Sequence, residues 1–161
     1  LATPHVRRWW AHEFTPAAIE HDFGGCVDGT EPCDVWITEL DGLPIGLIQD
    51  LAYAAYPEYV DEVEPILAVP DETWSIDYFI GVPELIGRGL GTRMLAAFSA
   101  ELWHRRPEAT CLLVPVNSSN VASWRALARA GYTIAAIGDL EPDVPDDPPS
   151  HHLMRLDRPT T

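Results

Sequence analysis

The stretch "LIGRGLGTRMLAAF", Leu85–Phe98, constrains the fold of this chain more than any other segment. Three glycines, Gly87, Gly89 and Gly91, come directly before an apolar run of helix-forming residues. A glycine-rich turn that opens a helix places several backbone N–H groups at the positive end of the helix dipole. Because glycine has no Cβ, an anion can approach those amides closely. The segment therefore predicts an anion site, usually for phosphate, between a strand and a helix.

Strand signals precede this turn. The segment "DVWITELDGLPIGLIQDL" predicts a hairpin with strands at Asp34–Leu40 and Leu43–Leu51 around Asp41-Gly42, a dipeptide suited to a tight primed turn. Thr73–Val82, "TWSIDYFIGV", has the composition of a buried strand. Between them, Tyr56–Glu72 carries six acids and three prolines, which predicts a long loop or a broken helix.

Two helices are predicted after the turn. The first ends near Arg105 or Arg106, before Pro107, and its apolar face carries Met94, Leu95, Phe98 and Leu102. The second lies in "NSSNVASWRALARAGY", which starts with capping residues and stops at Gly131; its apolar face carries Val121, Trp124, Leu127 and Ala128.

The remaining strands alternate with these helices. Thr110–Val116 is predicted to be a buried strand although it contains Pro115, and Tyr132–Ile137 and His152–Leu156 are predicted to be the final strands. Asp139–Ser150 holds four prolines and five acids, which is too polar for a core and too proline-rich for regular structure.

Length and composition narrow the class of protein. The chain has 161 residues, 47% of them hydrophobic, so we expect one globular domain spanning residues 1–161. The sequence shows neither a run long enough to span a membrane nor the pattern of a secretion signal, and we expect a cytoplasmic protein. A net charge of −15, with no lysine, disfavours binding to nucleic acid or anionic membrane and favours cationic partners. The alternative is that the acidic residues only keep the protein in solution.

The cysteines give no recognisable framework. Cys26, Cys33 and Cys111 are odd in number and lack a CxxC spacing, so we expect reduced thiols. A zinc site built from Cys26, Cys33 and the pair His151-His152 has the wrong spacing for the usual short-loop sites, and we expect no metal.

Three further interpretations of the glycine turn can be weighed from sequence. A dinucleotide-binding turn would follow the first strand and be spelled GxGxxG, whereas this turn is GRGLG and follows a hairpin and another strand. A nucleoside-triphosphate loop needs a lysine, which the chain lacks. A purely structural turn remains open.

The sequence resembles the GNAT superfamily of acyl-CoA-dependent acyltransferases. "ELIGRGLGTRM" is similar to that family's pyrophosphate loop, Gln/Arg-x-x-Gly-x-Gly/Ala: Gly89 and Gly91 match, while Ile86 stands where Gln or Arg is commonest. "NSSNVASWRALARAGY" resembles the family's later Asn-x-x-(Ala/Ser) helix, which ends in Ala-Gly-(Phe/Tyr). The resemblance covers Asp34 to about Arg158. It implies an α/β (α+β) GNAT fold whose mixed, mostly antiparallel sheet is flanked by helices and splayed between the family's fourth and fifth strands.

Within the superfamily, the chain looks most like the aminoglycoside 6'-N-acetyltransferases and the related siderophore-type acyltransferases. The segments that carry this likeness are "VRRWW", "LDGLPIGLIQ" and "SIDYFIG". That family normally has a strand and most of a helix ahead of the segment matching "ATPHVRRWW", so the resemblance implies that this chain starts within the first helix.

The resemblance implies acetyl-CoA as cosubstrate and assigns residues to it. The amides of Gly87, Arg88, Gly89, Leu90, Gly91 and Thr92 would hold the pyrophosphate, and Arg88 would add charge. The backbone of Phe79, Ile80 and Gly81 would pair with the pantetheine arm, and one of its N–H groups would polarise the thioester carbonyl. Asn120 would touch the arm, or would only cap the helix, or would do both.

Asp77 is the expected catalytic residue. It is a lone acid in an apolar strand, where a carboxylate is costly unless it is paired or opens into a polar cleft. In the resembled enzymes the matching Asp orients the amine and accepts its proton. The alternative is that Asp77 simply lies on a solvent-exposed face of the strand. Two positions depart from the family: Leu127 stands where a tyrosine often protonates the thiolate, and Pro115 replaces a second substrate-facing Asp.

The expected acceptor is a polycationic aminoglycoside, with antibiotic resistance as the implied role. The two acidic segments, Tyr56–Glu72 and Asp139–Ser150, hold eleven of the 25 acids and would flank the acceptor cleft. Tyr56 would contribute stacking or a hydrogen bond, and the expected substrate-facing residues are Trp10, Gln49, Tyr53, Asp77 and Asp143. The expected reaction is direct attack in a ternary complex, because Cys111, the one plausible nucleophile, lies in an apolar strand. The alternatives are a hydroxylamine siderophore-precursor acyltransferase and a non-catalytic acyl-CoA-binding module, and the protein could be a monomer or a homodimer.

Overall fold

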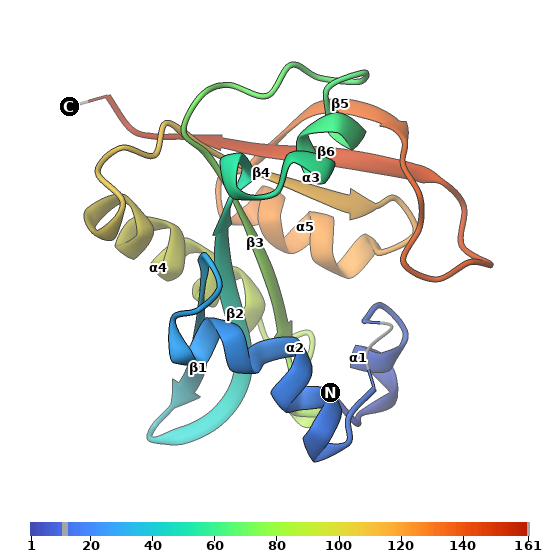
Figure 1. Cartoon of the computed structure of the whole chain (residues 1–161). Coiled ribbons are helices and arrows are strands. Elements are labelled where there is room, and N and C mark those ends of the chain that lie inside the picture. The colour runs from blue at the N-terminus through green and yellow to red at the C-terminus, as the bar shows by residue number, and fades with distance from the viewer. Residues whose placement is uncertain (11–12, 161) are drawn as a thin grey trace.

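A six-stranded mixed sheet forms the centre of the computed structural model, which describes residues 1–10 and 13–160 (Figure 1). Neighbouring strands are antiparallel except β3 and β4, which are parallel. This confirms the mixed, mostly antiparallel sheet. In sheet order the strands are β1 (Cys33–Leu40), β2 (Leu43–Ala52), β3 (Thr73–Ile80), β4 (Cys111–Asn117), β6 (Ser150–Asp157) and β5 (Thr133–Asp139).

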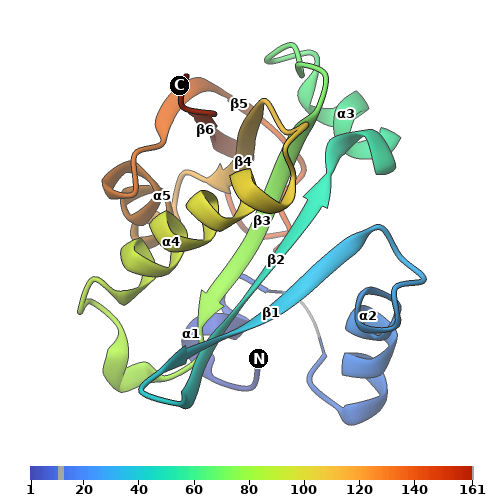
Figure 2. The ribbon, with the colours of Figure 1, turned by 90° about the vertical axis from the view of Figure 1, so that its left-hand side faces the viewer.

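Helices cover both faces of the sheet. The two helices α4 and α5 lie on one face, and α2 and α3 lie on the other (Figure 2). None of the described helices is long and apolar enough to cross a membrane. The helical elements are α1 (Pro4–Arg7), α2 (Pro16–Asp28), the 3₁₀ turn η1 (Tyr53–Ala55), α3 (Pro57–Val63), η2 (Pro83–Leu85), α4 (Leu90–Arg105) and α5 (Val121–Arg129).

The predicted hairpin is confirmed. Asp41 and Gly42, between β1 and β2, have φ angles of 52° and 78°. Positive φ at both central residues is the geometry of a type I′ turn, whose twist matches that of the flanking strands. The predicted broken helix within Tyr56–Glu72 corresponds to α3 and the irregular segment that follows it.

The parallel pair β3 and β4 splays apart. The strands pair only at Thr73 with Cys111 and at Trp74 with Leu112, after which they diverge. The expected splay is therefore confirmed. Pro115 lies beyond the last paired residue, where β4 has a strand partner only on its β6 side. A residue without an N–H is tolerated at such an unpaired edge.

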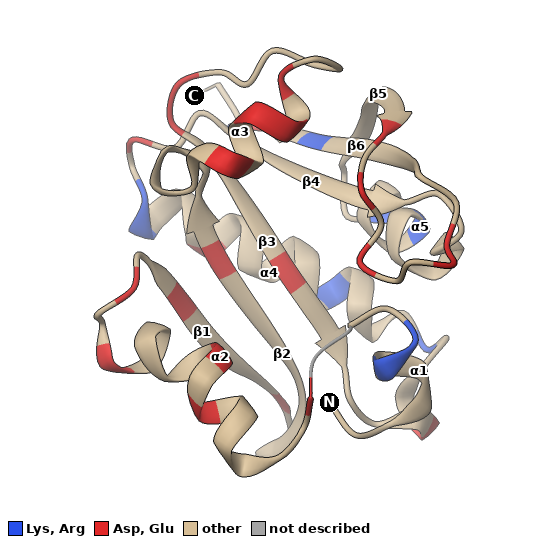
Figure 3. Ribbon diagram, turned by 45° about the vertical axis from the view of Figure 1, so that its right-hand side comes forward, with Lys and Arg blue, Asp and Glu red and all other residues tan. Residues whose placement is uncertain are grey.

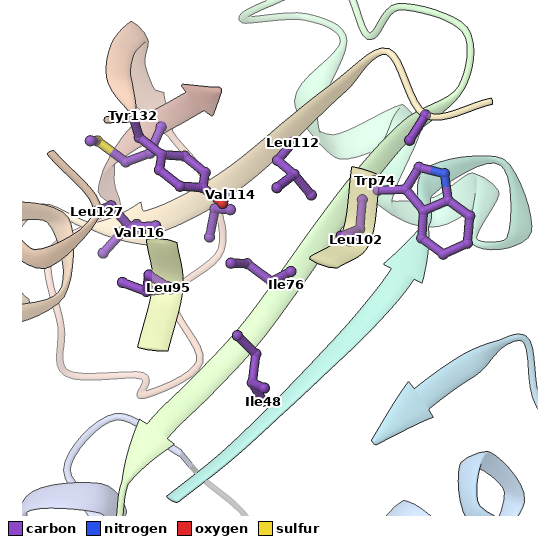
Figure 4. Close-up of a cluster of buried hydrophobic side chains, with 12 residues drawn as sticks. Ile48, Trp74, Ile76, Leu95, Leu102, Leu112, Val114, Val116, Leu127 and Tyr132 are labelled. Atoms are coloured by element: carbon purple, nitrogen blue, oxygen red, sulfur yellow. The ribbon is translucent and has the colours of Figure 1, made fainter. Parts of the chain in front are cut away.

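The main core lies between the sheet and the two helices α4 and α5 (Figure 4). Leu95 and Leu102 of α4 are 0% and 1% exposed, as their spacing predicts, and pack with Ile76 of β3. Each such burial stabilises the fold by roughly 1.5–3 kcal/mol. The predicted apolar face of α4 is thus confirmed.

The predicted apolar face of α5 is partly wrong. Trp124 and Leu127 pack into the core, but Val121 and Ala128 are exposed. The packed row continues instead to Ala130, three residues after Leu127. The short helix starts at the opening of the splay, so Val121 at its first turn borders a cavity rather than the core.

The expectation of three reduced thiols is also wrong. Cys26 and Cys33 form a disulfide, and Cys111 is free and buried. After α2, Gly29 takes a left-handed conformation with φ of 72° and reverses the chain. That reversal brings the two Cα atoms to 5.1 Å, within the range that a disulfide bridges. The spacing of the cysteines in the sequence does not by itself predict this reversal of the chain at Gly29.

Candidate functional site

Two cavities meet at the splay. One, of about 570 Å³, lies beside the glycine turn and the open edge of β3; we call it the loop-side cavity. The other, of about 580 Å³, is lined by residues of β2, β3, α2 and α3 together with the β5–β6 loop; we call it the acidic cleft. Trp9 and Trp10 line both, so two molecules bound in the two cavities would be neighbours.

The glycine turn presents backbone to the loop-side cavity. Gly87 and Gly89 have φ angles of 74° and 76°, which L side chains rarely adopt, and Gly89 is the residue before α4. No described side chain caps this helix end, although the first turn of a helix leaves its N–H groups without carbonyl partners. Within the described lining of the cavity are Gly87, Gly89, Gly91 and Thr92, but not Arg88 or Leu90.

The edge of β3 offers fewer backbone groups than expected. Phe79 and Ile80 line the cavity, but Gly81 donates its N–H to the carbonyl of Ile45 at 2.7 Å. Hydrogen-bond directions alternate along an antiparallel strand, so the backbone of Ile80 faces away from β2. His5 Nε2 lies 2.7 Å from the carbonyl oxygen of Ile80. The N–H of Gly81 is therefore engaged within the sheet, and the N–H of Ile80 is the group best placed for a bound arm.

Polar side chains at the start of α5 and along it line the loop-side cavity. The Asn120 side chain caps α5 by accepting a hydrogen bond from the Ser123 N–H at 3.2 Å, and it also lines the loop-side cavity. Arg125 and Arg129, four residues apart, line the same cavity. These two cations were not predicted from the sequence, although their spacing of i and i+4 places them on one helix face.

A tyrosine and a serine meet at the back of this cavity. The hydroxyl of Tyr78, on β3, lies 2.6 Å from Ser123 Oγ on α5, and both residues line the cavity. Burial raises the pKa of Tyr78, and the hydrogen bond with Ser123 only partly opposes this shift. The hydroxyl therefore keeps its proton at neutral pH. Leu127, one turn after Ser123, is 0% exposed and belongs to the core.

The acidic cleft gathers the predicted substrate-facing residues. Asp77 of β3 is exposed in it and accepts a hydrogen bond from Gln49 Nε2 on β2 at 3.1 Å. Trp10 packs edge-on against Phe79, with ring centroids 5.0 Å apart. The cleft contains all five predicted residues, Trp10, Gln49, Tyr53, Asp77 and Asp143, and also Tyr56.

Carboxylates surround this cleft. Acidic residues of α2, β3, α3 and the β5–β6 loop line it. Figure 3 shows the acidic positions of these elements in red. No arginine occurs among the described residues that line it. Burial, followed by the nearby charge of Asp77, raises the pKa of Tyr53. The lining carboxylates are Asp22, Glu31, Glu62, Asp77, Glu141 and Asp143.

Two findings change the expected acidic rim. Asp22 and Glu31 lie outside both predicted acidic segments, and only the docking of α2 beside the cleft reveals them. Conversely, Asp147 of the β5–β6 loop is bound by Arg8, whose Nη1 donates to Oδ2 at 2.7 Å. This hydrogen bond lowers the pKa of Asp147 and ties the loop to the segment after α1.

Comparison with known proteins gives a family and a fold. Residues 1–140 match the family model described as acetyltransferase (GNAT) domain. A search of curated proteins found no match. Among solved structures, aminoglycoside acetyltransferase AAC(6')-Ib in complex with coenzyme A superposes with a TM-score of 0.79 at 24% identity, covering 98% of this chain and 85% of that one.

Two further structures are similar. AAC(6')-Ib in complex with coenzyme A and kanamycin gives a TM-score of 0.77 at 25% identity, covering 97% of this chain and 84% of that chain. An aminoglycoside N(6')acetyltransferase from Legionella pneumophila gives a TM-score of 0.66 at 19% identity, covering 97% of this chain and 81% of that chain. The expected fold is confirmed by these likenesses.

Proposed function

The chain belongs to the GNAT acetyltransferase family and is an acetyl-CoA-dependent N-acetyltransferase, and on that premise we propose that its acceptor is the 6'-amine of an aminoglycoside. The observation that carries this proposal is the acidic cleft, which meets the loop-side cavity at Trp9 and Trp10. Six carboxylates and several aromatic rings suit an amino sugar with several positive charges. Solved relatives of the same fold bind kanamycin and ribostamycin.

Acetyl-CoA would occupy the loop-side cavity. The amides at Gly87 and Gly89 and in the first turn of α4 would hold its diphosphate, because they point positive partial charge at one place. Arg125 and Arg129 would add full positive charges from α5. The pantetheine arm would then run along the open edge of β3, where the N–H of Ile80 would bind it and bring the thioester beside Asp77.

Asp77 would orient the amine and take its proton. It stands on the cleft side of β3 beside Gln49, which holds the carboxylate in place through the 3.1 Å hydrogen bond. As the amine nitrogen bonds to the acetyl carbon, the C–S bond breaks and the excess proton on nitrogen passes to Asp77 directly or through water. The acyl group goes straight to the acceptor, so the scheme includes no covalent enzyme intermediate.

Tyr78 would protonate the departing thiolate. Leu127 has no proton to give, whereas Tyr78 lines the cofactor side of the splay and carries a hydroxyl group. Side chains of consecutive strand residues point to opposite faces, so Asp77 and Tyr78 would reach the reacting group from opposite sides. The tyrosine would regain its proton from solvent through Ser123 Oγ, 2.6 Å away.

Free thiol release tests the proposal. Acetyl-CoA is incubated with the protein and kanamycin or tobramycin, and the thiol is titrated against time. We expect release that depends on the aminoglycoside and is about 100-fold or more slower with the Asp77→Asn variant. Release only with longer acyl donors and a hydroxylamine acceptor would favour the siderophore-type alternative, and binding of acetyl-CoA without release to any amine would contradict catalysis.

A further inference from the structure

Two cysteine sulfurs and one carboxylate converge at the edge of the acidic cleft. Cys26 lies in the last turn of α2, and Cys33 opens β1. Glu31 Oε2 lies 3.8 Å from Cys26 Sγ and 4.0 Å from Cys33 Sγ. One donor atom from each of the three residues thus falls within 4.8 Å of the others, and all three residues line the cleft.

The backbone around Gly25 holds this arrangement. Its carbonyl accepts hydrogen bonds from the N–H groups of Thr30 and Glu31 at 2.9 and 3.0 Å, which folds the chain back over the end of α2. The Glu31 side chain then packs directly on Gly25, where an added Cβ would come within 2.6 Å of the carboxylate carbon. A glycine at position 25 is therefore what lets the carboxylate lie beside the sulfurs.

We propose that, once the Cys26–Cys33 disulfide is reduced, Cys26, Cys33 and Glu31 form a binding site for a thiophilic divalent cation such as Zn²⁺. A tetrahedral zinc site with ordinary bond lengths separates two sulfur ligands by about 3.7 Å and a sulfur from an oxygen by about 3.6 Å. The two sulfur–oxygen distances, 3.8 and 4.0 Å, are close to the second value, whereas the two sulfurs are bonded to each other here and must separate after reduction to reach the first. The surrounding carboxylates of the cleft, Asp22 among them, favour a cation there.

Binding of the cation requires two chemical steps, reduction of the disulfide and then coordination. A thiol or phosphine reductant supplies two electrons, two protons are taken up, and the S–S bond becomes two thiols. The cation then binds the two sulfurs as thiolates, and the two thiol protons are released to solvent. Three protein ligands leave one coordination position for water. The expectation that the chain holds no metal assumed ligands from the histidine pair and did not include Glu31.

This site has a consequence that rests on the proposed function. A bound cation engages the Glu31 carboxylate, which then no longer faces the acceptor, and occupies part of the cleft where the polycationic acceptor would bind. Zn²⁺ is therefore expected to raise the KM for the acceptor, in the reduced protein only, without a matching change in the KM for acetyl-CoA.

Metal binding itself is tested without acceptor or acetyl-CoA, so its failure is separate from failure of the proposed function. The full chain is reduced with a phosphine, and Zn²⁺ is titrated in competition with a chromophoric chelator. We expect one Zn²⁺ per chain, and a thiolate-to-metal absorption band when Co²⁺ replaces Zn²⁺. The oxidised protein should show neither.

Matched variants separate a built site from adventitious binding. Cys33→Ser should lose the Co²⁺ band, whereas Cys111→Ser should keep it, because Cys111 is buried in β4. Gly25→Ala, which displaces Glu31 and removes no ligand, should weaken Zn²⁺ binding about 10–100-fold, by analogy with the loss of a supporting residue. Gly24→Ala meets only the flexible end of Glu20 and should bind normally. Equal Zn²⁺ affinity in the reduced wild type and in the Cys26→Ser, Cys33→Ser double variant would overturn the proposal.

Discussion

Asp77 and Tyr78 are consecutive residues of β3, and their side chains line different cavities. One proton transfer is proposed for each of the two residues. The amine nitrogen loses its proton on the cleft side, and the sulfur gains one on the loop side. The two residues can therefore be tested separately.

Replacing Asp77 by Asn should lower kcat by about 100-fold or more, since general-base catalysis contributes 10²–10⁴-fold. The amide is similar in shape and still meets Gln49, so the affinity for acetyl-CoA should stay within about twofold. Steady-state kinetics with an aminoglycoside and calorimetric titration with acetyl-CoA measure the two quantities. Wild-type turnover in this variant would remove Asp77 from the mechanism.

Replacing Tyr78 by Phe should lower kcat by on the order of 10–100-fold. The loss should be smaller than for Asp77, because a thiolate is a tolerable leaving group. Tyr132→Phe is the matched control: its hydroxyl lies 2.8 Å from Ser99 Oγ, in a buried tyrosine–serine pair that lines neither cavity among the described residues. Equal kcat values for the two Phe variants would contradict a catalytic role for Tyr78.

At the scale of the element, the glycine turn is tested by adding one carbon. Gly89→Ala forces a left-handed conformation on a residue with a Cβ, so we expect a loss of roughly 1–2 kcal/mol in the free energy of unfolding and weaker binding of acetyl-CoA. Gly91 has no such φ angle, and an added Cβ there meets no atom. Gly91→Ala should therefore keep its stability and lose only cofactor affinity. Urea unfolding and titration with acetyl-CoA separate these effects.

A buried carboxylate near the C-terminal end of β2 gives a measurable pH signature. Asp50 is 0% exposed, and burial raises its pKa, although the charge of Arg106 opposes the shift. A carboxyl whose pKa is higher in the folded state binds its proton more tightly there, so its contribution to stability falls as the pH rises above its unfolded pKa. Relative to Asp50→Asn, the wild type should lose stability between acid and neutral pH. Urea unfolding of both proteins across that pH range measures the difference in their free energies of unfolding. This difference should not change with pH if folding leaves the pKa of Asp50 unchanged.

Elements with a local signal were predictable from sequence. The hairpin turn, the apolar face of α4 and the start of α5 follow from residue spacing that the structure confirms. The disulfide, Asp22 and Glu31 in the cleft, and the engaged N–H of Gly81 did not follow. Each depends on how α2 docks or on the pairing of β3, and such tertiary contacts leave no pattern in neighbouring residues.

For the whole molecule, the charge of −15 should favour the cationic acceptor over long distances. Salt screens such attraction, with a Debye length of about 10 Å at 0.1 M. The KM for an aminoglycoside should therefore rise several-fold from low to high ionic strength. A small acceptor with a single amine should show a much weaker dependence. Equal salt dependence for both would argue that the acidic rim does not select polycations.

In the proposed reaction, acetyl-CoA held at the glycine turn transfers its acetyl group to an amine lying in the acidic cleft beside Asp77. Mass spectrometry of kanamycin incubated with acetyl-CoA and the protein tests it most directly. We predict one added acetyl group per kanamycin, located on the 6'-amine, formed by the wild type and formed about 100-fold or more slowly by Asp77→Asn. Unmodified kanamycin after incubation with folded protein that demonstrably binds acetyl-CoA would contradict the account.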